Sequence, residues 1–402
     1  MTRYDYLIIG GGMSADAAAQ AIREKDENGT IGILSEEPTQ PFPRPALSKK
    51  LWTDPDFTRD ENWLGTVEAA RADVLLEHRV VGVDTDARSV TCANGDTYSY
   101  GRLLVATGGH PRTLEGLPEG ERVLYYRSLR DYERLRALTS GDGLADVKPH
   151  VAVVGGGYIG TEIAAAMLGE GCQVTLVHPD EVLGEKTYPT ELARELDQEF
   201  RSHGATVLAG ARVTDGDEEG DGVRLNLSDG SVVEADVAVV GLGIEPATGF
   251  LSGSLRRAED GSILVDDRLR TSAPDVWACG DVVTYPDAVL GLRRVEHVDN
   301  ATTMGAVAGR NLAGAEEVYD HTPMFYSDLF DLGYEAVGTL DASLETFVED
   351  AGDGGRIVYY LTDDEVVGVL GWNVFGRTDA AVALLAQHSR PADASDLAGA
   401  LD

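Results

Sequence analysis

The sequence has 402 residues, with 69 acidic and 33 basic side chains, a formal net charge of −36 and three cysteines. This length exceeds one ordinary domain, so two or three are expected, and the strong negative charge argues against nucleic acid and anionic membranes as partners. The cysteines lie far apart with no C-x-x-C pair, which excludes a disulfide scaffold and favours a reducing, cytoplasmic location.

No stretch of about 20 apolar residues is present, so we expect no membrane span. The first predicted strand begins at residue 5, and we therefore expect no targeting peptide. No metal site is predicted.

The charge is spread along the whole chain, and lysine occurs only five times against 28 arginines. The screening length for repulsion among such charges is about 3 Å at 1 M salt, whereas it is tens of ångströms at roughly 0.01 M, where the charges repel one another strongly. We therefore expect a halophilic protein from a salt-loaded cytoplasm. The alternative is an ordinary acidic protein.

The first predicted element is an apolar strand that ends at Gly10, and helical spacing follows from Ala15. Between them, Gly10-x-Gly12-x-x-Ala15 lets the backbone approach a pyrophosphate at the positive end of the helix. A second strand, Thr30 to Leu34, is followed by Glu36, whose carboxylate can bind an adenosine ribose. Alone, such a motif could be a structural turn, but this order of strand, helix and acid favours a dinucleotide site.

The pattern repeats after an apolar run that ends at Val154. Gly155-x-Gly157-x-x-Gly160 opens a second helix, and the next strand, Gln173 to Val177, leads to Asp180. The spacing from first glycine to acid is 26 residues in the first motif and 25 in the second. The sequence therefore predicts two bound dinucleotides, as in proteins that pass electrons between them.

The connecting segments have simpler patterns. Residues 38–52 contain four prolines, which stiffen the chain, and Arg44, Ser48 and Lys49 supply donors. This segment is either a surface connector or a clamp beside a cofactor. Residues 73–99 read as a small β-meander, and residues 103–109 as a buried strand ending in glycines.

The second half of the chain supports a discontinuous organisation. A second meander spans residues 223–233, the acidic stretch 215–222 reads as a solvated loop, and glycine-ended strands return after residue 235. A small-residue helix is expected at 298–312, and strands at 335–340, 357–361 and 366–370 precede a helix near 379–388. We predict an α/β fold with two Rossmann-like domains, residues 1–116 with 236–314 and residues 117–235, followed by an α+β domain at 315–402.

Motifs along the whole chain now resemble one family, the two-dinucleotide-binding-domain flavoproteins of the ferredoxin-reductase and apoptosis-inducing-factor branch, with a glutathione-reductase-like architecture. The motifs are the two glycine motifs, Phe42-x-Arg44-Pro45-x-Leu47-Ser48-Lys49, Ala106-Thr107-Gly108-Gly109-x-Pro111-Arg112, Gly241-x-Gly243, Gly280-Asp281, Arg293-Arg294-Val295-Glu296-His297 and Met324-Phe325-Tyr326-Ser327-Asp328. The resemblance implies FAD in the first domain, NAD(P)H in the second and a C-terminal domain that covers the flavin.

The resemblance also implies roles for individual residues. Gly10, Gly12 and Ala15 would hold the FAD pyrophosphate, Glu36 the ribose, Arg44, Lys49 and Arg112 the phosphates and isoalloxazine, Asp281 the ribityl chain, and Glu296 with His297 the pyrimidine edge. Tyr326 stands where apoptosis-inducing factors often carry tryptophan, and it could still stack on the flavin. Further cofactor-binding candidates are Ser14, Val81, Ala106, Thr107, Gly108, Gly155, Gly157, Tyr158, Ile159, Gly160, Glu162, His178, Asp180, Gly241, Gly243 and Val298.

Two sites are expected to act on the flavin. A helix starting at Val298 would direct its positive end at the reduced flavin, although Glu296 and His297 could instead be ordinary helix caps. Lys49 and Glu162, from different predicted domains, are the catalytic candidates, because in the family they pair beside flavin N5. The alternative is a surface salt bridge that contributes about 0–1 kcal/mol.

Choice of nicotinamide depends on Asp180. An acid within about 4 Å of a 2′-phosphate costs roughly 1–4 kcal/mol, so NADH is favoured over NADPH, although a protonated His178 could accept the phosphate. The stretch from Phe42 to Trp52 contains no cysteine, so disulfide reduction is not expected.

Two functions remain open. The first is an NADH-dependent flavoprotein reductase that passes electrons to a ferredoxin, a rubredoxin, a quinone or oxygen. The second is an NADH sensor of apoptosis-inducing-factor type, which signals through oligomerisation or partner binding with slow turnover. The sequence leaves a homodimer open and does not identify the acceptor.

Overall fold

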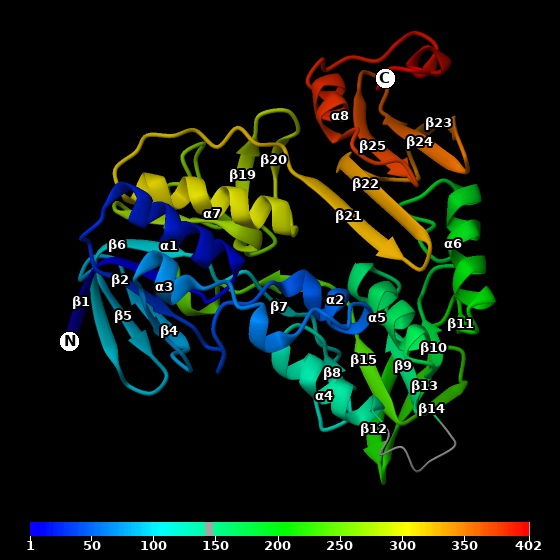
Figure 1. The fold of residues 1–402 in the computed structure, drawn as a ribbon, viewed down its shortest axis with the longest axis horizontal. Coiled ribbons are helices and arrows are strands. Elements are labelled where there is room, and N and C mark those ends of the chain that lie inside the picture. Colours follow the sequence, from blue (N-terminus) through cyan, green and yellow to red (C-terminus); the bar gives the residue numbers. More distant parts are fainter. Residues whose placement is uncertain (141–147, 402) are drawn as a thin grey trace. The chain divides into compact units, whose positions relative to one another are not determined.

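The computed structural model describes residues 1–140 and 148–401, which form two compact units (Figure 1). The first unit comprises Met1–Arg44, Thr58–His110 and Glu245–Phe325. The second comprises Pro45–Phe57, Pro111–Ile244 and Tyr326–Asp402. Each unit therefore contains segments from distant parts of the sequence.

A seven-stranded sheet forms the core of the first unit. Its order is β3-β2-β1-β6-β5-β4, and β18 also pairs with β6. The strands β1, β2, β3, β6 and β18 run parallel, whereas β4 and β5 are antiparallel to their neighbours. The bounds are β1 Thr2–Ile9, β2 Ile31–Leu34, β3 Asp73–Leu75, β4 Val80–Asp84, β5 Ser89–Cys92, β6 Thr97–Val105 and β18 Val276–Ala278.

The sequence predicts a meander and a separate buried strand at 103–109, but the structure joins them. Strand β6 closes the meander with β5 at its start and pairs with β1 along its length. Its last three residues are fully buried, which explains their apolar run.

Two helices pack closely in the first unit, α1 (Met13–Lys25) and α7 (Val298–Leu312). A Cβ at Gly305 would lie 2.5 Å from the carbonyl O of Ser14, and one at Gly309 would lie 2.2 Å from that of Ala18. Only glycine permits this approach. The remaining elements are α3 Thr66–Ala70, β17 Ile263–Leu264, β19 Val283–Asp287 and β20 Gly291–Arg293.

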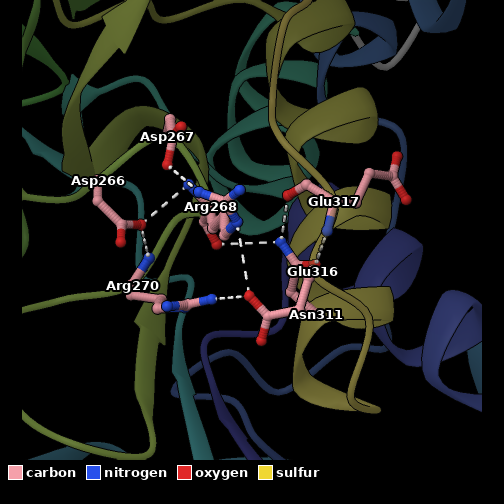
Figure 2. Close-up of polar contacts among 7 residues, drawn as sticks. All are labelled: Asp266, Asp267, Arg268, Arg270, Asn311, Glu316 and Glu317. Carbon is pink, nitrogen blue, oxygen red and sulfur yellow. Dashed lines mark hydrogen bonds and ion pairs between the residues drawn. The ribbon is translucent and has the colours of Figure 1, made fainter.

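A polar network fixes the chain that leaves α7, as Figure 2 shows. The buried Asn311 side chain donates to the carbonyl groups of Arg268 (3.0 Å) and Glu317 (2.9 Å), and it accepts from the Glu317 amide at 2.8 Å. Glu316 pairs with Arg268 and Arg270, and the Asp266 side chain accepts from the backbone amides of both arginines. These contacts join Asn311 and the residues after α7 to the segment 266–270, so the network anchors the end of α7.

The second unit contains a five-stranded parallel sheet with the order β11-β10-β9-β15-β8. Its strands are buried apolar runs, as expected for a parallel sheet covered on both faces. The bounds are β8 Val123–Tyr125, β9 His150–Val154, β10 Gln173–Val177, β11 Thr206–Leu208, β15 Val237–Val240, α2 Lys50–Thr53, α4 Leu129–Thr139, α5 Tyr158–Gly169 and α6 Thr190–Ser202.

The predicted solvated loop at 215–222 is wrong. Most of it lies in β12 (Val213–Glu219), which pairs antiparallel with β13 (Gly222–Leu227) beside β14 (Val232–Ala235). The acidic side chains are exposed while Gly216 is buried. Backbone pairing with β13 therefore stabilises a strand whose acidic composition is typical of a loop. Charged side chains on such an edge also discourage pairing with other molecules.

The last part of the second unit is an antiparallel sheet with the order β21-β22-β25-β24-β23 and helix α8. The Tyr360 hydroxyl donates to the Thr187 carbonyl at 2.8 Å, which ties this sheet to the loop after β10. The bounds are β21 Met324–Leu329, β22 Leu332–Gly338, β23 Glu345–Gly352, β24 Gly355–Leu361, β25 Val366–Trp372 and α8 Thr378–Leu385. The chain passes between units after Arg44 and after Phe57, and again within β7 (Gly109–Pro111), β16 (Ile244–Pro246) and β21.

The predicted α/β class with two Rossmann-like sheets is confirmed. The predicted domain boundaries stay a prediction. Across residues 1–140 and 148–401 we find no helix long and apolar enough to cross a membrane. The same residues hold no group of three or more His, Cys, Asp or Glu side chains able to bind a metal ion.

Candidate cofactor sites

The first glycine motif forms a tight turn before α1. Gly10 has φ +114°, and a Cβ there would lie 2.2 Å from the carbonyl O of Ala106, so this position requires glycine. Gly12 is the N-cap of α1, and no side chain caps that helix. A Cβ at Gly12 would meet nothing closer than the Arg44 Nε at 4.0 Å. The helix start is therefore uncapped and the space beside Gly12 is open, which fits a pyrophosphate.

The remaining candidates of the first motif lie around this turn. Ala15 is fully buried, and Ser14 lies against Gly280, where a Cβ would approach the Ser14 Oγ to 2.5 Å. Glu36 follows β2 with its side chain half exposed, 3.8 Å from the His110 ring. Its exposure leaves the carboxylate available to a ribose.

The start of α7 is a second uncapped helix end in the first unit. His297 is the N-cap but makes no side-chain capping bond, and its ring stacks on Phe325 with 4.8 Å between centroids. Glu296 pairs with Arg294 at 2.6 Å. The capping alternative for these residues is therefore not what the structure has, and the positive end of α7 remains able to face an anionic group.

The second glycine motif repeats the geometry of the first. Gly155 has φ +113°, and a Cβ there would lie 2.3 Å from the Gly241 carbonyl O. A Cβ at Gly160 would lie 2.0 Å from the Gly155 carbonyl O, whereas one at Gly157 would meet nothing within 4 Å. Gly157 is the uncapped start of α5. This end of the helix also fits a pyrophosphate.

The first turn of α5 exposes two large apolar side chains. Tyr158 is 39% and Ile159 is 37% exposed, so part of each side chain is accessible to a ligand. Elsewhere in the unit, the Arg112 side chain donates to the Ile244 carbonyl at 3.1 Å, and the Arg112 amide donates to the Gly243 carbonyl.

His178 and Asp180 follow β10 in different environments. His178 is buried against Gly156, burial lowers the pKa of its ring, and neither ring nitrogen has a hydrogen-bond partner. A neutral imidazole cannot supply the cation that a 2′-phosphate needs. Asp180 forms an ion pair with the exposed Lys186 side chain. This ion pair was not predicted, because the two residues are six positions apart in a loop without periodic structure.

A buried polar cluster surrounds Glu162 in the first turns of α5. The Lys49 Nζ lies 3.1 Å from Glu162 Oε1 and 4.5 Å from the centre of the Tyr326 ring. The Ser48 hydroxyl donates to Glu162 Oε2 at 2.5 Å, and the Ser327 hydroxyl donates to Oε1 at 2.7 Å. Lys49 and Glu162 therefore form the expected pair, but it is largely buried and is not the surface salt bridge of the alternative interpretation.

The segment that carries Lys49 packs within the second unit. The Tyr126 hydroxyl donates to the Leu47 carbonyl at 2.5 Å, and the Trp52 ring packs edge-on against Tyr132 with 4.9 Å between centroids. Lys49 is predicted in the first dinucleotide-binding domain, whereas the structure groups residues Pro45–Phe57 with Glu162. Buried apolar contacts of Leu47 and Trp52 explain the difference, and sequence order gave no signal of it.

The candidate residues divide between the two units. The first unit holds Gly10, Gly12, Ser14, Ala15, Glu36, Arg44, Val81, Ala106, Thr107, Gly108, Asp281, Glu296, His297 and Val298. The second holds Lys49, Arg112, Gly155, Gly157, Tyr158, Ile159, Gly160, Glu162, His178, Asp180, Gly241, Gly243 and Tyr326. Ser48 and Ser327 are contacts that the sequence analysis did not choose as site residues, although both lie inside motifs it quoted.

The three cysteines are not in environments that favour a reactive thiolate. Cys92, Cys172 and Cys279 are all buried, and burial raises the pKa of each thiol. This agrees with the expectation that the chemistry does not use a thiol.

Comparison with known proteins identifies the family. Residues 4–305 match the pyridine nucleotide-disulphide oxidoreductase family, and residues 308–351 match the C-terminal domain of mitochondrion-associated apoptosis-inducing factor. The chain belongs to this oxidoreductase family. It is an NAD(P)H-dependent flavoprotein reductase of the ferredoxin-reductase and apoptosis-inducing-factor branch, with FAD and NAD(H) as its cofactors. The uncapped helix starts behind Gly12 and Gly157 fit the pyrophosphates of these two groups.

Curated relatives of this flavoprotein span several activities. It is 33% identical to the ferredoxin reductase subunit of 5,5′-dehydrodivanillate O-demethylase from Sphingobium sp., over 92% of this chain and 90% of that one. It is 31% identical to monodehydroascorbate reductase 3 from Arabidopsis thaliana, over 91% and 88%. It is 29% identical to apoptosis-inducing factor 1 from Dictyostelium discoideum, over 100% and 81%. The chain spans 64% of the length of a 28% identical Drosophila melanogaster relative.

Solved structures support the same fold. The ferredoxin reductase of the CYP199A2 system from Rhodopseudomonas palustris matches with a TM-score of 0.81 and 28% identity, over 92% of this chain and 91% of that one. The putidaredoxin reductase–putidaredoxin complex matches with a TM-score of 0.86 over 96% and 94%, at 24% identity.

Proposed function

We propose that this flavoprotein oxidises NADH and delivers electrons to a small carrier protein of ferredoxin or rubredoxin type. The observation that carries the proposal is the buried Lys49–Glu162 pair beside Tyr326, in a chain whose thiols are all buried. Similarity to a bacterial ferredoxin reductase subunit along most of both chains supports the carrier protein as acceptor.

The residues of the first unit bind FAD. The amide groups at the start of α1, beyond Gly12, hold the pyrophosphate, and Glu36 accepts hydrogen bonds from the adenosine ribose. The uncapped start of α7 at Val298 stabilises negative charge on the reduced ring. Bound FAD supplies the hydride-accepting chemistry and the release of electrons to the acceptor.

The residues of the second unit bind NADH. The amide groups behind Gly157 hold its pyrophosphate, while Asp180 accepts from the adenosine ribose hydroxyls. A 2′-phosphate would face the Asp180 carboxylate and a neutral His178, so NADH is the preferred donor. Because Lys186 already pairs with Asp180, the preference is moderated, and the ratio of kcat/KM for NADH and NADPH measures it directly.

Lys49 and Glu162 order the nicotinamide ring for hydride transfer. Both side chains are largely removed from water, so their charges act strongly on a polar carboxamide. We expect Lys49→Ala to slow flavin reduction by NADH at least tenfold, about 1.4 kcal/mol in barrier height, while the melting temperature changes little. Stopped-flow absorbance of the flavin and a thermal melt measure the two effects. Equal loss of stability and rate would mean that the pair is structural.

A panel of acceptors separates the proposed reductase from its alternative. Reduced protein is mixed with oxidised ferredoxin, rubredoxin, a quinone, oxygen and monodehydroascorbate, and reoxidation is followed at the flavin band. Rapid reoxidation by an iron–sulfur or rubredoxin-type carrier supports the reductase. Reoxidation only by the small molecules would contradict a protein acceptor.

A second candidate function is the NADH sensor of apoptosis-inducing-factor type. The match of residues 308–351 to the C-terminal domain of that factor favours it. A sensor would remain reduced for minutes in air and would change its elution volume in size-exclusion chromatography after NADH is added. This measurement also tests whether the protein is a homodimer.

A further inference from the structure

The Glu162 carboxylate is held by two serines from distant parts of the chain. Ser48 precedes α2 and donates to Oε2 at 2.5 Å, while Ser327 in β21 donates to Oε1 at 2.7 Å. The exposed fractions are 7% for Glu162, 4% for Ser48 and 0% for Ser327. Each carboxylate oxygen therefore has its own buried hydroxyl donor.

Lys49 is bound to the same carboxylate in a different way. Its Nζ lies 3.1 Å from Oε1, but the direction does not satisfy hydrogen-bond geometry. The ammonium group also faces the Tyr326 ring at 4.5 Å. Lys49 is thus held by charge and by the aromatic face, whereas the serines hold the carboxylate by directed hydrogen bonds.

This difference decides which side chain can move. A buried carboxylate that loses its only partner is strongly destabilised, because an uncompensated charge remains out of water. Glu162 does not face that loss, since two hydroxyl donors stay in contact when Lys49 is displaced. The long, flexible lysine side chain is then the moving part, and the carboxylate is the fixed part.

We propose that Ser48 and Ser327 are positioning residues, which keep the Glu162 carboxylate in place and its charge stabilised while Lys49 moves aside for nicotinamide. The inference rests on the proposed function of the Lys49–Glu162 pair. It predicts that the serines act on hydride transfer only through Glu162.

Stopped-flow reduction of the FAD-bound protein tests the inference with Ser48→Ala and Ser327→Ala measured separately. We expect each substitution to lower the limiting rate constant of flavin reduction about tenfold, which corresponds to about 1.4 kcal/mol. We expect the Kd for NADH to change less than threefold, roughly 0.6 kcal/mol. Ser48→Thr keeps a hydroxyl group and should restore most of the rate.

A matched control is Thr139→Val, which removes another buried hydroxyl group of the second unit. The Thr139 hydroxyl donates to the Leu135 carbonyl at 2.8 Å within α4. The melting temperature of the Thr139→Val variant should fall as much as those of the serine variants, while its rate of flavin reduction stays at the wild-type value. Serine variants that lose stability without losing rate would overturn the inference.

A double-mutant cycle separates the inference from the proposed function. In a Glu162→Ala background no carboxylate remains to be held, so Ser48→Ala and Ser327→Ala should have no further effect on the rate. An undiminished serine effect in that background would overturn the inference and leave the proposed function intact. A normal rate for Glu162→Ala itself would instead overturn the proposed role of the pair, whatever the serines do.

Discussion

Gly157→Ala should abolish tight NADH binding without harming the fold. A Cβ at Gly157 meets no protein atom within 4 Å, and the backbone angles of φ −84° and ψ −173° suit alanine. The new methyl group would instead occupy the open space beside the uncapped start of α5, where we propose that the pyrophosphate binds. Replacing glycine at an unstrained position commonly stabilises a protein by about 0.4–1 kcal/mol, so the melting temperature should stay or rise.

The loss of affinity follows from the contacts that the methyl group displaces. An anion in a favourable position at a helix N-terminus gains up to about 2 kcal/mol. Losing about 2 kcal/mol raises the Kd for NADH about 30-fold. Titration of the protein with NADH, followed by nicotinamide fluorescence or by flavin reduction, measures this change.

Gly169→Ala is the matched control, because it makes the same change at the other end of α5, where a Cβ also meets nothing within 4 Å. It should leave the Kd for NADH unchanged. Gly160→Ala provides the contrast, since its Cβ would lie 2.0 Å from a carbonyl oxygen and should disrupt the unit itself. An unchanged Kd in Gly157→Ala would refute the assignment of this helix end to the pyrophosphate.

The remaining predictions concern pH, salt and thiols. The His321 Nε2 and Asp299 Oδ2 atoms lie 2.6 Å apart, and this hydrogen bond raises the pKa of His321. Burial acts to raise the pKa of Asp299, but the hydrogen bond to His321 acts to lower it, and the pKa of Asp299 is lowered overall. The contribution of His321 to the free energy of unfolding is fully present below the ordinary histidine pKa, and it is lost as pH rises through the raised pKa of His321. The contribution of Asp299 is lost as pH falls through its lowered pKa. His321→Gln should therefore lower the melting temperature most near about pH 5–6 and least near about pH 9, and equal losses at both would contradict the pairing. With 69 acidic and 33 basic residues, the protein should melt at higher temperature and react faster in molar KCl than at low salt; a melt that ignores KCl would remove the halophilic hypothesis. Iodoacetamide should leave NADH oxidation unchanged, because the three thiols are buried with raised pKa values, and rapid inactivation would reveal a thiol that takes part.

Local sequence patterns predicted the two strand–turn–helix elements that carry the glycine motifs. Each motif has a glycine with φ above +100°, at Gly10 and Gly155, and an uncapped helix start two residues later, at Gly12 and Gly157. The predicted helix at 298–312 coincides with α7, because its small residues are required by the close contact with α1.

The errors have a different origin. The acidic residues of β12 favour a loop, and only pairing with β13 makes them a strand. Likewise, Ser48 and Ser327 are 279 positions apart, and no local pattern indicates that both bind one carboxylate. Contacts between residues that are far apart in the sequence leave no periodic pattern from which they could be predicted.

The membership of Pro45–Phe57 in the second unit has a practical consequence for protein engineering. A chimaera that exchanges only residues 111–244 between relatives would combine one protein's Glu162 with another protein's lysine segment. The preference for NADH or NADPH would then change because Lys49 and Glu162 are mismatched, and not because of the residues around Gly157 and Asp180. Grafts that carry residues 45–57 together with residues 111–244 would keep Lys49, Glu162 and Ser48 from the same protein.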